Sequence, residues 1–141
     1  MKIIIGSDHA GFRLKEEIKK MLLRKYQVED VGAYSEEPSD YPLYAKKVAK
    51  KTVSSGSKGI MVCKTGIGSC MAVNKVKGAR GALPYSEKSA RLSREHNNAN
   101  VICLGSIMDK KLAKKMVNIF LKTKFSEGAR HKRRIKELDR I

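Results

Sequence analysis

The chain has 141 residues, which suits one compact domain over residues 1–141 and leaves no room for a second sizeable core. With 41% hydrophobic and 32% charged residues and no apolar run near the roughly 20 residues of a membrane span, the composition is typical of a soluble globular protein. The net charge is +17, and the opening segment Met1–Ile5 lacks the length and cleavage site of a signal peptide, so we expect a basic cytoplasmic protein.

Short runs of β-branched residues alternate with amphipathic stretches along the whole chain. The expected strands are residues 2–5, 27–31, 59–63, 79–83 and 100–104. The expected helices are one carrying Leu14, Ile18, Met21 and Leu22, one that starts after Pro42, and others over residues 71–75, 86–94 and 109–121. Residues 129–141 read as a final basic helix, which we expect to contact a partner subunit.

This alternation, with strands that are apolar on both faces, predicts an α/β fold with a parallel sheet covered on each side. Right-handed crossovers then give a single-domain, doubly wound, Rossmann-like αβα sandwich with a five-stranded parallel sheet and a C-terminal helix. In such a sheet, ligands bind beyond the carboxyl ends of the strands. The first and third expected strands should bring their following loops together at that edge.

The positive charge has two interpretations. A nucleic-acid-binding protein would use it for phosphate contacts. Alternatively, the lysines cover the solvated faces of separate helices, and their positions favour this second interpretation. They fall into three groups: Lys15, Lys19, Lys20, Arg24 and Lys25; Lys46, Lys47, Lys50 and Lys51; and Lys110, Lys111, Lys114 and Lys115.

The loop after the third expected strand carries the most informative chemistry. Cys63 stands at the strand end, and the turn that follows opens a helix whose free N–H groups stabilise a thiolate. The same N–H groups suit an enediolate oxygen or a phosphate. The alternative is that Cys63 is a small buried hydrophobic residue. Cys70, one step inside the helix, is expected to pack on the sheet, and with Cys103 the three cysteines should be free thiols in a reducing compartment.

Other candidate residues are weaker when taken singly. Asp8 and His9 suit contacts to hydroxyls and a phosphate, although Asp8 could equally cap a helix. His96 titrates in a useful range but could be a helix C-cap. The arginines of the C-terminal segment suit phosphate, against the alternative of a solvated basic tail.

Taken together, these segments resemble the B type of ribose-5-phosphate isomerase, in the family that also holds galactose-6-phosphate isomerase. The matching pieces occur in family order: residues 6–12, 40–42, 63–68, 72–75, 92–97 and 128–131, followed by Arg134. The resemblance covers essentially the whole chain.

The resemblance implies a homodimer with active sites at the subunit boundary, with a tetramer as a further option. It also implies conversion of ribose 5-phosphate to ribulose 5-phosphate in the pentose phosphate pathway, through an enediolate and without metal or organic cofactor. By position, Cys63 would be the base that moves a proton between C2 and C1, and His96 would help open the sugar ring. The residues implied to bind substrate are Asp8, His9, Lys64, Thr65, Gly66, Ile67, Gly68, Asn97, Arg130 and Arg134.

Two positions depart from the family pattern. Lys64 replaces a usual glycine, which would add strain if the backbone there needs a positive φ, and would otherwise place an ammonium group near Cys63. Ile107 replaces an arginine that commonly binds phosphate, so substrate choice could differ. Ser69 stands where some relatives place a glutamate base, which keeps that role on Cys63.

Three alternatives remain open at this stage. One is a hexose-6-phosphate isomerase acting on allose or galactose phosphates; the presence of all the catalytic residues in one chain favours the pentose enzyme. Another is a basic nucleic-acid-binding protein on a borrowed fold. A third is a family member that has lost activity through Lys64 and Ile107.

Overall fold

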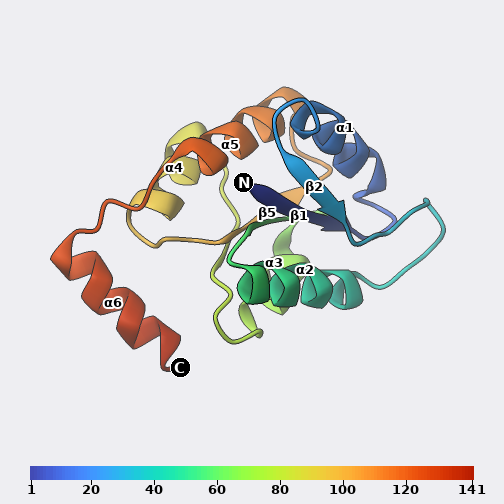
Figure 1. Ribbon diagram of the computed structural model, residues 1–141. Helices are drawn as coiled ribbons and strands as arrows, with labels where there is room; N and C mark the ends of the chain where they lie inside the picture. Colours follow the sequence, from blue (N-terminus) through green and yellow to red (C-terminus); the bar gives the residue numbers. More distant parts are fainter.

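The computed structural model describes residues 1–141 as a three-layer α/β sandwich around one sheet (Figure 1). All five strands run parallel, in the order β2-β1-β3-β5-β4. Their bounds are β1 Lys2–Ser7, β2 Gln27–Asp30, β3 Lys58–Cys63, β4 Gly81–Ala82 and β5 Val101–Gly105. The predicted fold class is therefore confirmed.

Helices cover both faces of the sheet because its central strands are apolar on both sides. Figure 1 shows α1 (Phe12–Leu22), α4 (Glu87–Glu95) and α5 (Lys110–Lys122) on one face, and α2 (Tyr41–Ser55) and α3 (Ile67–Asn74) on the other. The core is accordingly divided in two. Ile3, Ile5, Ile60, Val62, Ile102 and Leu104 face the first set of helices, whereas Ile4, Met61, Val101 and Cys103 face the second.

Two elements differ from the sequence-based expectation. Helix α3 begins at Ile67, four residues earlier than predicted, because Gly66 adopts a left-handed conformation (φ +81°) that starts the helix at once. Strand β4 has only two residues because the Asn74 side chain bonds both peptide groups of Gly81, accepting its N–H at 2.8 Å and donating to its carbonyl at 3.1 Å. A side chain thus protects this sheet edge where a further strand could otherwise pair.

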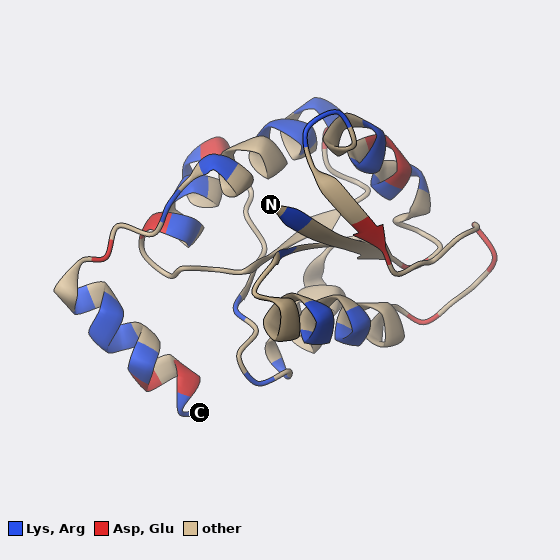
Figure 2. Cartoon of the chain, viewed as in Figure 1, with Lys and Arg blue, Asp and Glu red and all other residues tan.

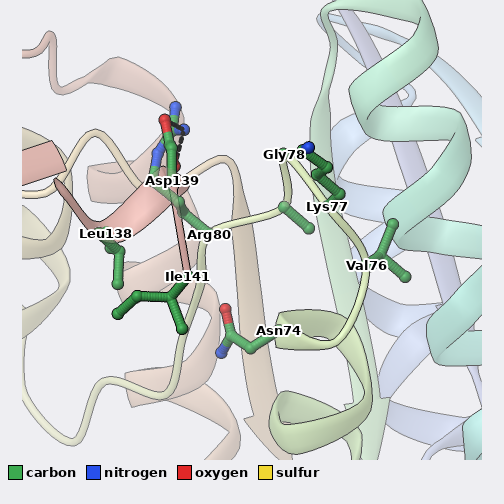
Figure 3. A pocket seen from close by; sticks show the side chains of 9 residues that line it. Asn74, Val76, Lys77, Gly78, Arg80, Leu138, Asp139 and Ile141 are labelled. Atoms are coloured by element: carbon green, nitrogen blue, oxygen red, sulfur yellow. Dashed lines mark hydrogen bonds and ion pairs between the residues drawn. The ribbon is translucent and has the colours of Figure 1, made fainter. Parts of the chain in front are cut away.

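The sixth helix, α6 (Ala129–Asp139), lies away from the body of the domain (Figure 1). None of its residues is buried, and Leu138 is 48% exposed. One link to the body is the ion pair between Arg80 and Asp139, 3.1 Å long, beside a small cavity of about 190 Å³ that Leu138 and Ile141 help to line (Figure 3). None of the six helices combines the length and hydropathy needed to cross a lipid bilayer.

Lysine and arginine residues are spread over the helices on both sides of the sheet, as expected for solvated helix faces (Figure 2). Lys15 is an exception, and its prediction as a surface lysine was wrong because its side chain is completely buried. It lies one position after Leu14 on the inner face of α1, where its aliphatic stem packs in the core.

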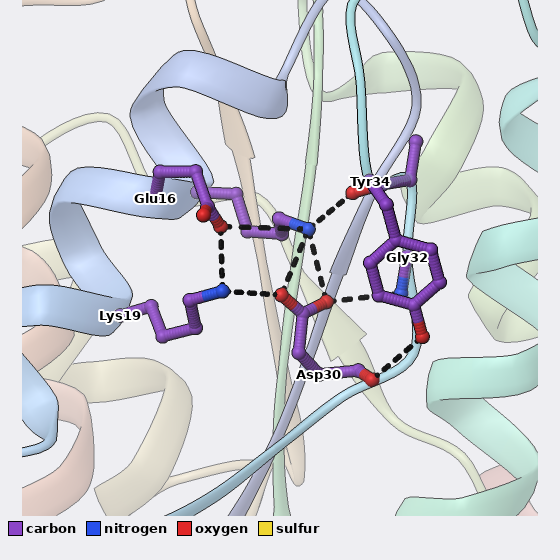
Figure 4. A network of polar contacts seen from close by, with 7 residues as sticks. Glu16, Lys19, Asp30, Gly32 and Tyr34 are labelled. Atoms are coloured by element: carbon purple, nitrogen blue, oxygen red, sulfur yellow. Dashed lines mark hydrogen bonds and ion pairs between the residues drawn. The ribbon is translucent and has the colours of Figure 1, made fainter.

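The ammonium group of Lys15 is held by a buried polar network at the end of β2 (Figure 4). It donates to both carboxylate oxygens of Asp30, at 2.9 and 3.0 Å, and to the carbonyl of Ala33. Lys19 donates to the same carboxylate at 2.8 Å. Burial acts to raise the pKa of Asp30, but hydrogen bonds from Lys19, the Gly32 amide and Lys15 outweigh it, so the pKa lies below its ordinary value.

Removing the carboxylate charge should strongly destabilise the fold. We expect Asp30→Asn to lower the free energy of unfolding by about 3–5 kcal/mol at pH 7, because the buried Lys15 loses its nearest anion and keeps only Glu16, 3.7 Å away. Since the pKa of Asp30 is lower in the folded than in the unfolded chain, this stabilisation is present at neutral pH and is lost as the pH falls through the folded value.

The measurement is urea unfolding of wild type and Asp30→Asn at several pH values, with the exposed Glu37→Gln as the matched charge-removal control. The gap between wild type and Asp30→Asn should narrow below about pH 4, near the ordinary pKa of an aspartate. A gap of the same size at pH 7 and at pH 3 would contradict this account.

Candidate active site

The carboxyl ends of β1 and β3 meet, as the sequence predicted. These strands are neighbours in the sheet, and the backbone N–H of Asp8 donates to the carbonyl of Val62 at 3.2 Å. Gly11 lets the loop after β1 cross this point, since a Cβ added there would lie 2.4 Å from the Val62 carbonyl oxygen. The loops that follow the two strands therefore share one edge of the sheet.

Cys63 ends β3 at the base of this edge and is 4% exposed. Its sulfur accepts the N–H of Gly66 at 3.1 Å and lies 3.1 Å from the hydroxyl oxygen of Ser69. Both groups belong to the turn that opens α3, so the sulfur faces the positive end of that helix. Cys63 is buried, but it is a polar, hydrogen-bonded group, unlike an ordinary hydrophobic core residue.

Further backbone donors surround this turn. The amides of Lys64, Thr65 and Gly68 donate to no acceptor of the chain, as is usual at the start of a helix. Lys64 and Thr65 are exposed, and Gly68 is half-buried. Converging free N–H groups at a helix N-terminus bind anionic oxygens. The loop thus offers a base and an array of anion-stabilising donors close to one another.

Lys64 fits the loop without strain. Among non-glycine residues only Asn98 and Glu127 have positive φ, so the position of Lys64 does not require glycine. Its carbonyl accepts the N–H of Ile107 at 3.2 Å, and the carbonyl of Cys63 accepts that of Ser106 at 2.8 Å. The loop after β5 is therefore held against the Cys63 loop by two backbone hydrogen bonds.

Asp8 and His9 stand beside this loop with different partners. The Asp8 carboxylate is buried and accepts the N–H of Gly11 at 3.0 Å, so it holds the turn into α1. The N–H of His9 donates to the hydroxyl of Ser39 at 3.0 Å, and its Nδ1 lies 3.1 Å from the Ser39 backbone nitrogen. Ser39, which the sequence did not single out, orients the imidazole and leaves Nε2 free for a ligand.

The remaining predicted site residues lie at the opposite edge of the sheet. His96 caps the C-terminus of α4, and Asn97 follows in the turn before β5. Strand β5 lies between this turn and the Cys63 edge, and its five residues span about 16 Å. Arg130 and Arg134 lie on α6, which meets the same end of α4. One chain therefore does not bring these four residues to Cys63.

A stacked pair of histidines joins α4 to α6. The rings of His96 and His131 lie 4.4 Å apart, with an interplanar angle of 15°. Desolvation, followed by the charges of His96, Arg130 and Arg134, lowers the pKa of His131. No three His, Cys, Asp or Glu side chains lie close enough together to hold a metal ion.

The surface around the Cys63 loop is unusually apolar. Ile107 lines a cavity of about 400 Å³ together with Ile67 and Tyr85. These three side chains are 66%, 51% and 81% exposed, and the nearby helix residue Met71 is 64% exposed. A cluster of large exposed hydrophobic side chains is typical of a surface that another protein covers.

Comparison with known proteins agrees with this architecture. The family model described as Ribose/Galactose Isomerase matches residues 3–138. This chain belongs to that family. A probable ribose-5-phosphate isomerase B of Mycoplasma genitalium is 47% identical, over 98% of this chain and 93% of the relative.

Solved structures of family members share the whole fold. A ribose 5-phosphate isomerase of Thermotoga maritima superposes with a TM-score of 0.95 and is 48% identical, covering 99% of this chain and 98% of the other. The ribose-5-phosphate isomerase B of Mycoplasma genitalium with bound ribulose-5-phosphate gives a TM-score of 0.91 at 44% identity, covering 99% and 94%. The fold and the family expected from the motifs are thus confirmed.

In this member of the ribose/galactose isomerase family, Ser69 is the contact that the sequence analysis missed. Its completely buried hydroxyl lies 3.2 Å from the Gly66 carbonyl and 3.1 Å from the Cys63 sulfur. When Cys63 is a thiol, the Ser69 proton can point to the carbonyl; when Cys63 is a thiolate, the proton can turn to the sulfur. The signal in the sequence was the spacing of six residues between Cys63 and Ser69, which places the two side chains on either side of a turn that opens a helix.

Cys70 provides an internal comparison for the reactivity of Cys63. It is half-buried and packs against the core cluster that contains Cys103, as expected. A hydrogen bond with the Cys103 thiol lowers its pKa, burial opposes this, and the Asn74 amide lowers it further.

We predict that Ser69→Ala slows alkylation of Cys63 at pH 7 by about tenfold, because the thiolate loses one hydrogen-bond donor. Mass spectrometry of the alkylated peptides measures the rate, with Cys70 as the internal reference and Ser54→Ala, at an exposed position, as the matched control. Equal alkylation rates for Cys63 in wild type and in Ser69→Ala would show that the hydroxyl does not assist the thiolate.

Proposed function

We propose that the protein is a cofactor-independent aldose–ketose isomerase that interconverts ribose 5-phosphate and ribulose 5-phosphate. The observation that carries the proposal is the Cys63 sulfur at the N-terminus of α3, hydrogen-bonded by Gly66 and Ser69 beside free backbone amides. The proposal is also supported by relatives named as ribose-5-phosphate isomerase B, one of which was solved with ribulose-5-phosphate bound.

The proposed reaction is a proton transfer between neighbouring carbons. The thiolate of Cys63 removes the C2 proton of the open-chain aldose, the C2–H electron pair forms the C1–C2 double bond, and O1 takes the negative charge. The amides of Lys64 to Gly68 stabilise this enediolate. Cys63 then returns the proton to C1 while the O2 proton moves to O1, which gives the ketose and restores the thiolate. Proton count and charge balance over the cycle.

The other site residues bind and open the sugar in this proposal. His96 helps open the furanose ring, and Asn97 hydrogen-bonds substrate oxygens. Asp8 contacts the sugar. His9, Arg130 and Arg134 bind the phosphate, for which arginine offers paired donors. Within this scheme residues 1–141 act as one domain in the cytoplasm.

The direct test is a ribose 5-phosphate isomerisation assay in the presence of EDTA, comparing wild type with Cys63→Ala. We expect kcat to fall by about 10²–10⁴-fold in the variant, because the base is lost while the amides remain. Circular dichroism should show an unchanged fold, and Cys70→Ala provides the matched cysteine control. Full turnover by Cys63→Ala would contradict the proposed role of this residue.

We also propose that the active enzyme is a homodimer whose two sites each combine residues of both chains. Within one chain, His96 and Cys63 lie at opposite edges of the sheet. The exposed apolar side chains beside the Cys63 loop and the unburied helix α6 are the surfaces that a second copy would cover. The apolar surface beside the Cys63 loop of one copy would face helix α6 of the other copy. The two-fold axis of a homodimer would form this contact twice. Pairing of dimers into tetramers is a further option.

Subunit complementation tests this arrangement. Cys63→Ala and His96→Asn homodimers should each be nearly inactive. When they are mixed under conditions that exchange subunits, about a quarter of wild-type activity should return, since half the dimers are mixed and each has one intact site. Sites built within single chains would give no recovery, because every site in a mixed dimer would then carry one of the two substitutions.

Two other functions would give different results in these assays. A hexose-6-phosphate isomerase would use the same chemistry, and a clear preference for allose or galactose 6-phosphate over ribose 5-phosphate in the assay would identify it. Ile107, which replaces a usual phosphate-binding arginine, is the feature that bears on this choice. A nucleic-acid-binding protein would instead show salt-sensitive RNA or DNA binding that is unaffected by Cys63→Ala. The contacts of Cys63 favour the isomerase.

A further inference from the structure

A basic cavity lies at the edge of the sheet opposite the Cys63 loop. It measures about 550 Å³ and lies between the start of β3 and the segment that follows α5. The charged side chains that line it are Lys58, Arg94, Lys122, Lys124 and Glu127. One carboxylate thus stands among four positively charged side chains.

One of these cations is half-buried and another is buried, and neither has an acidic partner. Lys58 is half-buried, and its ammonium group makes no hydrogen bond or ion pair within the chain. Arg94 is only 6% exposed and also forms no ion pair. Glu127, at the rim, is exposed and is bonded to neither of them. The ten ion pairs of the chain all involve other residues; Arg80, for example, pairs with Asp139.

Part of Arg94 has a structural role that accounts for its burial. Its Nε donates to the carbonyl of Thr123 at 3.1 Å, and its Nη1 donates to the Asn98 side chain at 2.8 Å and to the Ala99 carbonyl. These acceptors are neutral, and Nη2 has no acceptor in the chain. The turn is therefore held in place, and although the guanidinium also lies 5.6 Å from the centroid of the Phe120 ring, it has no acidic partner.

Such an arrangement has an electrostatic cost. Burial, followed by the charges of Arg94 and Arg80, lowers the pKa of Lys58, and burial together with Arg80 lowers that of Arg94. A buried cation without a counter-ion is destabilising, and a bound anion would relieve this cost. The Lys58 ammonium group has no partner in the chain that would offset the cost of its partial burial.

We propose that this cavity binds a small phosphate-bearing anion, held by Lys58 and Arg94 with Lys122 and Lys124 at its rim. A guanidinium and an ammonium group side by side provide charge-assisted donors that suit phosphate oxygens. The volume exceeds that of inorganic phosphate, so the ligand class is a phosphorylated metabolite or a diphosphate. The site differs from the proposed substrate site, because none of the residues assigned to that site lines this cavity.

The cavity also adjoins the segment that carries part of the proposed active site. Arg94 lies two residues before His96, and Thr123 and Lys124 lead from α5 toward α6. A ligand that bridges Lys58, Arg94 and Lys124 would therefore join the α4–β5 turn to the start of the segment that carries Arg130 and Arg134. Binding at this site is a property separate from turnover.

Calorimetric titration of the full-length protein with inorganic pyrophosphate in low-salt buffer tests the proposal. We expect two classes of site per chain. Lys58→Met should weaken one class by about tenfold or more through loss of one charge-assisted contact, with kcat/KM for ribose 5-phosphate within about twofold of wild type. Arg134→Ala should weaken the other class and raise KM for the sugar phosphate.

Lys25→Met, which removes an exposed lysine outside the cavity, is the matched control for net charge. Equal weakening by Lys25→Met and Lys58→Met would indicate non-specific attraction and overturn the proposal, as would a single class of site that Lys58→Met leaves unchanged. If Lys58→Met instead raised KM as Arg134→Ala does, the cations would belong to the substrate site. Because binding is measured without turnover, the result stands even if the chain proves inactive on ribose 5-phosphate.

Discussion

The architecture of the proposed site depends on the hydrogen-bonded junction between β1 and β3. The N–H of Asp8 bonds the Val62 carbonyl, and Gly11 crosses the same carbonyl without a side chain. Neighbouring strands are about 4.8 Å apart, so the loop that carries Asp8 and His9 is held within one strand spacing of the loop that carries Cys63. A residue larger than glycine at position 11 would separate the two loops, whatever chemistry they carry.

The base of the proposed mechanism would be built from common parts. The Cys63 sulfur belongs to the last residue of a strand, and its hydrogen-bond partners come from the first turn of the next helix. Lys64 shows that the loop tolerates a side chain after the cysteine, because only Gly66 requires the left-handed region. The left-handed Gly66 starts the helix and donates its own N–H to the sulfur.

Much of this structure was predictable, and the exceptions have physical causes. Runs of β-branched residues, such as Ile3 to Ile5, predicted the strands of the parallel sheet. Motifs that follow the strand ends predicted that the loops after the first and third strands meet at the Cys63 edge. Lys15 was misassigned because its sequence position beside Leu14 does not disclose the partner Asp30, which lies fifteen residues away. The sequence left open which chain supplies His96 to a given site, with His96 and Asn97 as plausible donors from a neighbouring chain. Motif order says nothing of sheet edges, although a residue that caps a helix C-terminus in a βαβ unit must lie at the amino edge. Local sequence patterns thus predict burial and turns, whereas contacts between residues far apart in the sequence require the structure.

The exposed helix α6 links the order of the C-terminal segment to the concentration of the protein. Eleven residues are too few to form a stable helix alone in water, and α6 buries none of its side chains in its own chain. Within its own chain, the Arg80–Asp139 ion pair and the His96–His131 stack support it. In the proposed homodimer a partner would cover the rest, so ordering of the helix and association would become one equilibrium. In dilute solution the segment would fray and become susceptible to proteases, and specific activity would rise with protein concentration. The helix that presents Arg130 and Arg134 would in this way make catalysis sensitive to how much enzyme a cell contains.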